Sequence, residues 1–269
     1  MTCLDSRLPT ERGPMVSVII PTHQNYHGLE RAVESVFDQT YQNIEVLIVD
    51  DASAEPARSE IERIATRDPR VELLRLNENY GAGVARRQGQ IRARGEYIAF
   101  LDADDIWLPE KLAVQIGLMI ENNWNLSHTS YYKSSSPPNT SVEPYAYGLS
   151  RVVHARPVVD YDMLLSSNWI ACSTAVYRRA NFGKMYMPDL RRRQDYAFWL
   201  SLLRTGEKSY GVTKPLTVYC VGNGSLSSNK LRAAIEHYRV LKDYTDLAWM
   251  ERLKRFSIYV GHAFRKYKI

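Results

Sequence analysis

The sequence predicts an α/β protein with a doubly wound, mostly parallel sheet, flanking helices and a C-terminal helical extension. Two observations lead to this fold class. Apolar β-branched runs alternate with helix-spaced apolar residues over residues 15–105, and two of these runs end in Pro21-Thr22 and in Asp50-Asp51. Open sheets of this kind bind ligands outside the carboxyl ends of their strands, so we expect the chemistry there.

The first elements form a strand–helix–strand unit. Residues 16–20 and 45–49 are continuous apolar runs, as expected for parallel strands buried on both faces. Residues 28–38 lie between them and form a helix, because their apolar residues fall at helical spacing. Those residues are Leu29, Ala32, Val33, Val36 and Phe37.

The alternation continues along the chain. Helices are expected at residues 57–66, 84–94 and 109–122, strands at 71–76, 97–101 and 168–177, and a further helix opening close to Asp195. Residues 133–148 are too irregular for a core element, and a connection of this length is usually functional. We expect three parts: an N-terminal extension (1–14), a main domain (15–235, with halves 15–106 and 107–235) and a basic amphipathic helical segment (236–269).

Composition excludes several classes of protein. The chain has 269 residues, 45% hydrophobic and 24% charged, with a net charge of +5, as expected for a soluble globular protein. No run is long enough to span a membrane, and the N-terminus does not resemble a signal peptide. Three scattered cysteines fit neither a disulfide framework nor a zinc site, which favours the cytoplasm. No nucleic-acid module is recognisable, so no nucleic-acid partner is expected.

The most informative segment is Gly95-Glu-Tyr-Ile-Ala-Phe-Leu-Asp-Ala-Asp-Asp-Ile-Trp-Leu-Pro109. Its apolar strand ends at Asp102, Asp104 and Asp105. Carboxylates this close repel one another unless a divalent cation lies between them, and hard oxygen ligands favour Mg²⁺ or Mn²⁺. We therefore expect a metal site that holds a phosphate. The alternatives are a strand-closing turn that caps the next helix and a phosphatase of the haloacid-dehalogenase type. An EF-hand is excluded by Ile106 and Trp107.

Two further segments place charged residues at the beginning of an expected helix. Gly81-Ala-Gly83 lacks the third glycine of a dinucleotide fingerprint, because Arg86 stands there. The glycines then turn the chain into a helix whose N-terminus, with Arg86 or Arg87, faces an anion, or else form a plain turn. Three arginines precede Asp195, which is either functional or a helix cap.

Together these motifs resemble the inverting family 2 glycosyltransferases of the GT-A fold, especially bacterial enzymes that build lipopolysaccharide and capsule. Val16-Ser-Val-Ile-Ile-Pro-Thr22, Val49-Asp-Asp-Ala-Ser53, residues 79–89 and Phe100-Leu-Asp-Ala-Asp-Asp105 stand in the family's order. Gln194-Asp195 and Gly224-Ser-Leu-Ser-Ser-Asn229 continue it. The resemblance covers residues 15–235.

The resemblance implies a site residue by residue. Asp195 would be the general base, and Asp102 and Asp104 would hold Mn²⁺ or Mg²⁺. Trp169, Arg193 and Gln194 would lie on the acceptor side. Arg86 would approach the ribose or diphosphate, although Arg87 stands where the family usually has Asn. The full nucleotide-sugar set is Pro21, Thr22, Asp50, Asp51, Asn79, Gly83, Arg86, Asp102, Ala103 and Asp104.

The implied function is transfer of a hexose or N-acetylhexosamine from a UDP-sugar to a saccharide acceptor, such as one linked to polyprenyl diphosphate, with a β-linkage formed. Among the donors we favour galactose. A metal-dependent phosphohydrolase or sugar nucleotidyltransferase, and a catalytically silent nucleotide-sugar-binding subunit, are the alternatives.

The C-terminal segment has the pattern of an amphipathic helix. Six Lys or Arg and no acid lie between Arg252 and Lys268. The apolar residues at three- and four-residue spacing are Met250, Leu253, Phe256, Val260, Ala263, Phe264 and Tyr267. Such a helix either lies on an anionic membrane surface, on the inner face of the cytoplasmic membrane, or packs on its own catalytic domain.

Overall fold

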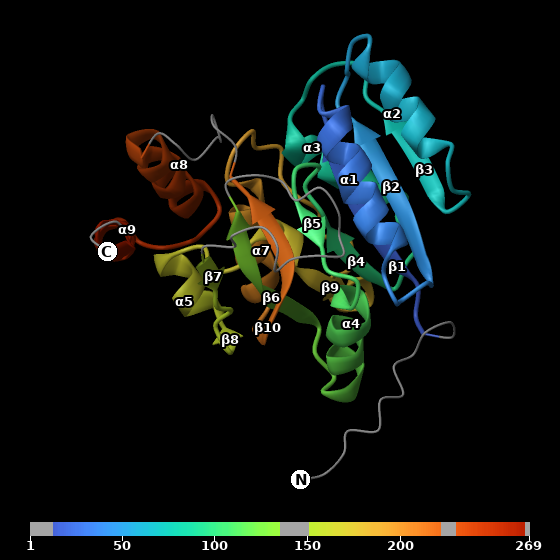
Figure 1. The fold of residues 1–269 in the computed structure, drawn as a ribbon. Helices are drawn as coiled ribbons and strands as arrows, with labels where there is room; N and C mark the ends of the chain where they lie inside the picture. The colour runs from blue at the N-terminus through green and yellow to red at the C-terminus, as the bar shows by residue number, and fades with distance from the viewer. Residues whose placement is uncertain (1–12, 135–150, 222–229, 267–269) are drawn as a thin grey trace.

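The computed structural model describes residues 13–134, 151–221 and 230–266 (Figure 1). The strands are β1 (Val16–Thr22), β2 (Ile44–Asp50), β3 (Val71–Arg75), β4 (Tyr97–Phe100), β5 (Ile106–Trp107), β6 (Leu126–Ser134), β7 (Arg151–Val153), β8 (Val158–Val159), β9 (Val176–Arg178) and β10 (Ser209–Cys220). The helices are α1 (Tyr26–Phe37), α2 (Ala57–Ala65), α3 (Ala82–Arg92), α4 (Lys111–Glu121), α5 (Tyr161–Ser166), the 3-10 helix η1 (Cys172–Thr174), α6 (Arg179–Phe182), α7 (Gln194–Leu203), α8 (Lys230–Asp243) and α9 (Trp249–Lys266).

One mixed sheet joins these strands in the order β3-β2-β1-β4-β9-β6-β10-β5, with β7 on β6 and β8 on β10. β1 runs parallel to β2 and β4, β2 to β3, and β6 to β10. β9 is antiparallel to both of its neighbours, β4 and β6. The mostly parallel sheet with flanking helices confirms the fold class expected from the sequence.

Alternation along the central strands builds two cores, one on each face of the sheet. Val18 and Ile20 of β1 belong to the core that includes residues of α1, α2 and α4. Ile19, between them, belongs to the core that includes residues of α3, α5 and α7. Every residue of β1 and of β2 is buried, as expected for parallel strands covered on both faces.

One expected element is wrong. Residues 168–177 were expected to form a strand, but η1 interrupts them and only β9 is extended. The turn closes because the Thr174 hydroxyl and amide both donate to the Ala171 carbonyl, at 2.7 and 3.0 Å. Ser173 is thereby turned toward the acidic cluster rather than along a ladder.

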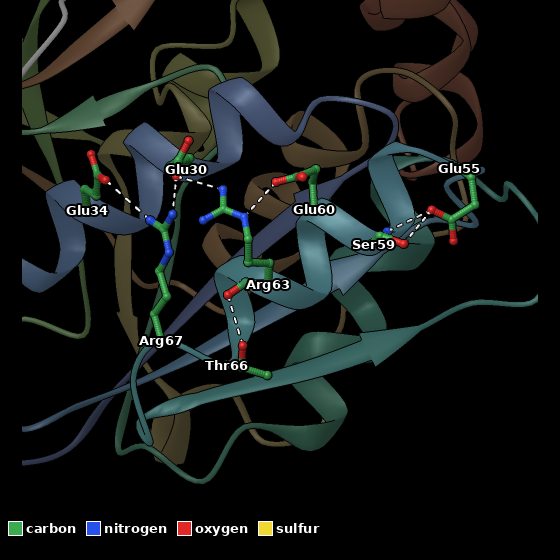
Figure 2. Close-up of polar contacts among 8 residues, drawn as sticks. All are labelled: Glu30, Glu34, Glu55, Ser59, Glu60, Arg63, Thr66 and Arg67. Atoms are coloured by element: carbon green, nitrogen blue, oxygen red, sulfur yellow. Dashed lines mark hydrogen bonds and ion pairs between the residues drawn. The ribbon is translucent and has the colours of Figure 1, made fainter.

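Ion pairs on the surface align α2 with α1 (Figure 2). Arg63 donates to Glu30 at 3.1 Å and to Glu60 at 2.7 Å, and Arg67 pairs with Glu30 and with Glu34. Because these side chains reach solvent, each pair contributes only about 0–1 kcal/mol. The buried residues of α2, such as Ile61, supply the larger part of its packing.

The two C-terminal helices lie at the other end of the molecule from α2 and β3, beside α5 and α7 (Figure 1). α8 and α9 contact each other, and α9 contacts α5. Val240 and Leu241 of α8 are buried in the same core as α7. The C-terminal helices therefore pack on the half of the sheet formed by the later strands.

A buried carboxylate connects the beginnings of the central strands. Glu45 is 3% exposed and accepts hydrogen bonds from Ser17 Oγ (2.6 Å), the Arg94 amide (2.6 Å) and the Gly95 amide (3.1 Å). Burial by itself would raise the pKa of Glu45, but the hydrogen bonds from Ser17 and Arg94 hold that pKa below its ordinary value.

We expect Glu45→Gln to lower the free energy of unfolding by about 1–3 kcal/mol at neutral pH, because charge-assisted hydrogen bonds are lost. A depressed carboxylate pKa stabilises the fold above the unfolded-state pKa and loses this contribution as pH falls through the folded-state pKa. The difference from the unsubstituted protein should therefore narrow below about pH 4. Urea unfolding at several pH values measures this.

The control is Glu72→Gln, which removes the solvent-facing pair with Arg92. It should change the unfolding free energy by less than about 0.5 kcal/mol. Equal effects of the two substitutions would contradict the role given to Glu45.

Candidate active site

The acidic cluster lies where β4 ends, beside the carboxyl end of β1. Asp102, Asp104 and Asp105 each place a carboxylate oxygen within 4.8 Å of the others. Asp104 is exposed, Asp102 is half-buried and Asp105 is buried. A hard divalent cation is the ligand that such a set of oxygens favours, and the exposed carboxylates are those it can reach.

The like charges of the cluster are not compensated within it. Displacement of water by protein atoms and the like charge of Asp102 raise the pKa of Asp104 to about 6. Because the Asp104 side chain is exposed to solvent, we attribute this rise mainly to the negative charge of Asp102 rather than to burial. Burial, followed by the charges of Asp102 and Asp104, raises the pKa of Asp105 well above its usual range.

Asp105 fixes the loop to the rest of the sheet. Its carboxylate accepts hydrogen bonds from Ser173 Oγ at 2.5 Å and from the Cys220 amide at 2.9 Å. Ser173 Oγ also accepts from the Asp102 amide at 3.1 Å, and the Ser173 carbonyl accepts from Trp107 Nε1 at 2.7 Å. Ser173 therefore holds the acidic loop in place. The sequence did not reveal it, because it was assigned to a strand.

Of the two adjacent arginines on α3, Arg86 enters the site. Arg86 is 4% exposed and its guanidinium pairs with Asp102, whereas Arg87 faces solvent. Burial disfavours the charged form of Arg86 and by itself would lower the pKa of this side chain. The negative charge and the hydrogen bond of Asp102 nevertheless raise the pKa of Arg86 above its ordinary value, and Asp195 adds to the increase. Arg86 Nε and Nη1 have no hydrogen-bond partner among the described residues. Arg87 stands where the resemblance leads us to expect Asn, but this difference does not remove Arg86 from the site.

The first βα loops are held by Asp50 and Asp51. The Asp51 carboxylate accepts from the amides of Tyr80 (2.9 Å) and Gly81 (2.7 Å), so Asp51 is itself an anion at the N-terminus of α3. Asp50 accepts from the Ser53 amide at 3.0 Å. Both carboxylates thus already have protein partners. Thr22 Oγ1, also buried, has none among the described residues.

Asp195 lies in the first turn of α7, but it is not the capping residue. The N-cap is Arg193, in a left-handed conformation (φ 60°), and no side chain caps the helix. The Asp195 carboxylate instead accepts from Asn168 Nδ2 at 3.0 Å. Asp195 is therefore not an N-cap, although the helix dipole still favours an acid in the first turn of α7.

A close approach brings the segment before α7 against the start of α3. A Cβ on Gly83 would lie 2.7 Å from the Leu190 carbonyl oxygen and 2.8 Å from that of Pro188. Arg191 Nη2 donates to the Asn79 carbonyl at 2.8 Å. Only a glycine at 83 allows residues 188–194, which include Gln194, to lie against the start of α3.

Trp169 is half-buried and packs against the core that contains α5 and α7. The Arg156 guanidinium lies 4.2 Å from the centroid of its ring, and its Nε1 donates to the Met163 carbonyl at 3.2 Å. One face of this aromatic ring is therefore covered by Arg156. The segment 135–148 and the 224–229 motif lie outside the described residues.

Besides Ser173, three groups at the site were missed by sequence reasoning. Arg31 of α1 lowers the pKa of Asp104, against the larger effects that raise it, so a cation from the first helix faces the acidic loop. Cys172 is buried in the field of Arg86, and burial raises the pKa of its thiol well above the ordinary value. Asn168 binds Asp195. Nothing in the periodicity distinguishes these residues from ordinary surface or core positions.

No helix in the described parts of the chain is long and apolar enough to cross a membrane.

Comparison with known proteins gives matches over most of the chain. Residues 17–184 match the family model described as glycosyl transferase family 2. The chain is 36% identical over 253 residues to the putative teichuronic acid biosynthesis glycosyltransferase TuaG of Bacillus subtilis, covering 94% of this chain and 97% of that one. It is 33% identical over 228 residues to the UDP-Glc:alpha-D-GlcNAc-diphosphoundecaprenol beta-1,3-glucosyltransferase WfaP of Escherichia coli, covering 85% and 86%.

Two solved structures resemble the fold. S. aureus TarS 1-349 in complex with UDP-GlcNAc superposes with a TM-score of 0.68 at 18% identity, covering 93% of this chain and 73% of that one. The mannosyltransferase PcManGT from Pyrobaculum calidifontis, in complex with GDP-Man and Mn²⁺, superposes with a TM-score of 0.63 at 18% identity, covering 97% and 79%. At these identities the likeness concerns the fold, and it confirms the GT-A fold expected from the sequence.

The acidic loop also depends on a close approach by α1, which gives a prediction. A Cβ on Gly28 would lie 2.4 Å from the Ala103 carbonyl oxygen. We expect Gly28→Ala to displace the loop and to weaken metal-dependent nucleotide binding by about 10-fold or more, which is about 1.4 kcal/mol. Titration calorimetry with UDP and Mn²⁺ measures this.

The matched control is Gly117→Ala on α4, where an added Cβ meets nothing within 4 Å. It should leave nucleotide binding unchanged and stabilise the helix by about 0.5–1 kcal/mol. Unaltered nucleotide affinity in Gly28→Ala would show that the loop tolerates the displacement.

Proposed function

The chain belongs to the family 2 glycosyltransferases, and we propose that it transfers a hexose or N-acetylhexosamine from a UDP-sugar to a lipid-linked saccharide with inversion. The acceptor would be polyprenyl-diphosphate-linked, and the product a β-linked bacterial surface polysaccharide. The observation that carries this proposal is one buried cation that pairs with the acidic cluster and lies within electrostatic reach of the second acidic centre. Arg86 pairs with Asp102 and lies in the field of Asp195.

The two centres have different chemical capacities. Asp102 and Asp104 form a hard-oxygen set whose like charges are only partly offset by Arg86, and this set fits Mn²⁺ or Mg²⁺. A divalent cation bound there would stabilise the charge that develops on a departing diphosphate. Asp195, oriented by Asn168, is a single carboxylate suited to take the proton from an attacking hydroxyl. A single in-line displacement would invert the anomeric carbon.

The donor would lie along the carboxyl ends of β1, β2 and β4. Thr22 Oγ1 is a buried hydroxyl there that has no hydrogen-bond partner among the described residues. The loops held by Asp50 and Asp51 would shape the uracil and ribose pocket. Pro21, Asn79, Gly83 and Ala103 would contribute backbone surface. Arg86 is fixed beneath Asp102, so we assign it to orienting that carboxylate rather than to reaching far into the ligand.

The acceptor proposal draws on the named relatives. The E. coli relative's name specifies UDP-Glc as donor and GlcNAc-diphosphoundecaprenol as acceptor. Galactose was favoured from the sequence, whereas that name specifies glucose, so both belong in a donor screen. Arg193 and Gln194 directly precede Asp195, and Trp169 follows Asn168, which donates to Asp195. These three residues would form the acceptor side.

The C-terminal helix supports a membrane surface as partner, with a face different from the one expected. Phe256, placed by the sequence in one stripe with Met250 and Leu253, packs on the domain core. Trp249 and Met250 are each 66% exposed and Leu253 is 44% exposed. We propose that these three side chains enter the headgroup region at the inner face of the cytoplasmic membrane, with Lys254 beside anionic lipid.

A donor screen tests the function as a whole. UDP release would be measured with UDP-glucose, UDP-galactose and their N-acetyl forms, Mn²⁺, and a short-chain GlcNAc-diphosphate lipid in detergent. Acceptor-dependent release with one donor supports the proposal. Release of inorganic phosphate, or no turnover with any of these donors, would contradict it.

Turnover should require the metal site. Asp104→Ala should abolish turnover while the melting temperature is retained, because a principal oxygen ligand is removed from an exposed loop. Glu121→Ala, at an exposed position on α4, is the control and should be fully active. Undiminished activity in excess EDTA would overturn the metal assignment.

Asp195 should be needed for the chemical step but not for donor binding. We expect Asp195→Asn to lower kcat by about 10²–10⁴, equivalent to roughly 3–5 kcal/mol of barrier, with UDP affinity unchanged. Asp189→Asn, at an exposed acid in the preceding segment, serves as the control. A kcat near that of the unsubstituted enzyme would remove Asp195 from the mechanism.

Vesicle sedimentation tests the membrane face. Replacing Trp249, Met250 and Leu253 by Ser should reduce binding to anionic vesicles by at least about 10-fold, because buried apolar area is lost. The control replaces exposed Ile91 and Ile120, on α3 and α4, by Ser. A chain ending at Lys242 should bind no better than the first variant. Equal sedimentation of all proteins would exclude α9 as the membrane contact.

A further inference from the structure

The inner face of α9 contacts both segments that hold Asp195. Asp195 is positioned from one side by Arg193, where α7 begins, and from the other by Asn168, which follows α5. Tyr259 and Arg255 lie one turn apart on α9, so they project from the same face of the helix. Tyr259 contacts the segment at the start of α7, and Arg255 contacts α5.

Tyr259 holds the beginning of α7. Arg193 Nη2 donates to the Tyr259 hydroxyl at 3.0 Å and approaches the Ala233 carbonyl of α8 at 3.4 Å. Arg193 has φ 60°, a left-handed conformation that non-glycine residues adopt at a cost. Contacts from α8 and α9 are therefore what keeps this residue in the conformation from which α7 starts.

A ring stack supports the same contact. The His237 ring of α8 lies between Tyr259 and Tyr196, with centroid distances of 3.7 and 4.7 Å. Burial, and to a lesser extent the charge of Arg193, lower the pKa of His237 to about 3, so the imidazole is neutral in the stack. Tyr196 directly follows Asp195, and the stack thus connects α9 to the first turn of α7.

Arg255 holds the other segment. Its guanidinium forms a two-pronged pair with the Asp162 carboxylate of α5, with one contact at 3.1 Å, and approaches Ser166 Oγ at 3.5 Å. Bidentate pairs of this kind fix geometry as well as charge. Ser166 ends α5, and two residues later Asn168 Nδ2 donates to Asp195.

We propose that α9 is a clamp in which Tyr259 and Arg255 act as positioning residues for the Asp195 carboxylate. This inference rests on the proposed role of Asp195 as general base. Positioning matters for the rate, because displacing a base by about 1 Å from its productive position can slow the reaction by about 100-fold. The clamp gives a role to α8 and α9, which follow the residues of the nucleotide site in the chain and pack against the acceptor half.

The test uses Tyr259→Phe, which keeps the ring stack but removes the hydroxyl, and Arg255→Gln. Matched controls on α8 are Tyr238→Phe and Arg239→Gln, because Tyr238 packs on Phe256 and the exposed Arg239 pairs with Glu236 of its own helix. Each is made in the full chain and again in the Asp195→Asn chain. A detergent-soluble acceptor keeps membrane binding out of the measurement. The readouts are kcat, UDP affinity and melting temperature.

We expect each clamp variant to lower kcat by about 10- to 100-fold with UDP affinity unchanged, and to have no further effect in the Asp195→Asn chain. Unchanged kcat in both clamp variants, with Asp195→Asn strongly impaired, would overturn the clamp and leave the proposed function standing. A loss of equal size in the Asp195→Asn chain would also overturn it, by showing general damage. If Tyr259→Phe melts early, Arg255→Gln decides. Near-normal Asp195→Asn would instead refute the proposed function.

Discussion

The Arg86 guanidinium is buried among groups of opposite charge, and the arrangement of the site depends on it. A buried cation without a partner would cost several kcal/mol, and Asp102 supplies that partner. The acidic cluster depends on Arg86 as strongly, because Asp102, Asp104 and Asp105 repel one another at the end of a single strand. One guanidinium offsets only part of this charge, even with Arg31 facing Asp104 from α1. The excess negative charge is what a divalent cation would neutralise.

Close approaches of backbone to backbone surround this charge arrangement. Gly28 lets α1 meet the acidic loop, and Gly83 lets the segment before α7 meet α3. Ser173 then connects the loop to η1 through two hydrogen bonds. Side chains from four separate parts of the chain are thereby held with little freedom. The proposed mechanism places a base and a metal on opposite faces of one sugar, and it requires this kind of fixed spacing.

The sequence was informative where a residue's role follows from local pattern. Fully buried runs gave β1 and β2, and an Asp-rich ending to an apolar run gave the acidic cluster. It was uninformative where tertiary contacts decide. Ser173 leaves the expected strand because η1 closes on Ala171, and no period marks that turn. The choice between Arg86 and Arg87 depends on which face of α3 meets the sheet, because one is buried and its neighbour is exposed.

The C-terminal helix shows the same limit and adds a mechanistic consequence. Its apolar spacing predicted one stripe, yet Phe256 faces the domain while Trp249 and Met250 face outward. A helix with apolar side chains on two faces can contact its own domain and a second surface at once. If the outward face lies on a membrane, the inward face transmits that position to Arg193 and Asn168, and so to Asp195. Attachment to the surface that carries the acceptor and orientation of the base would then depend on one rigid element.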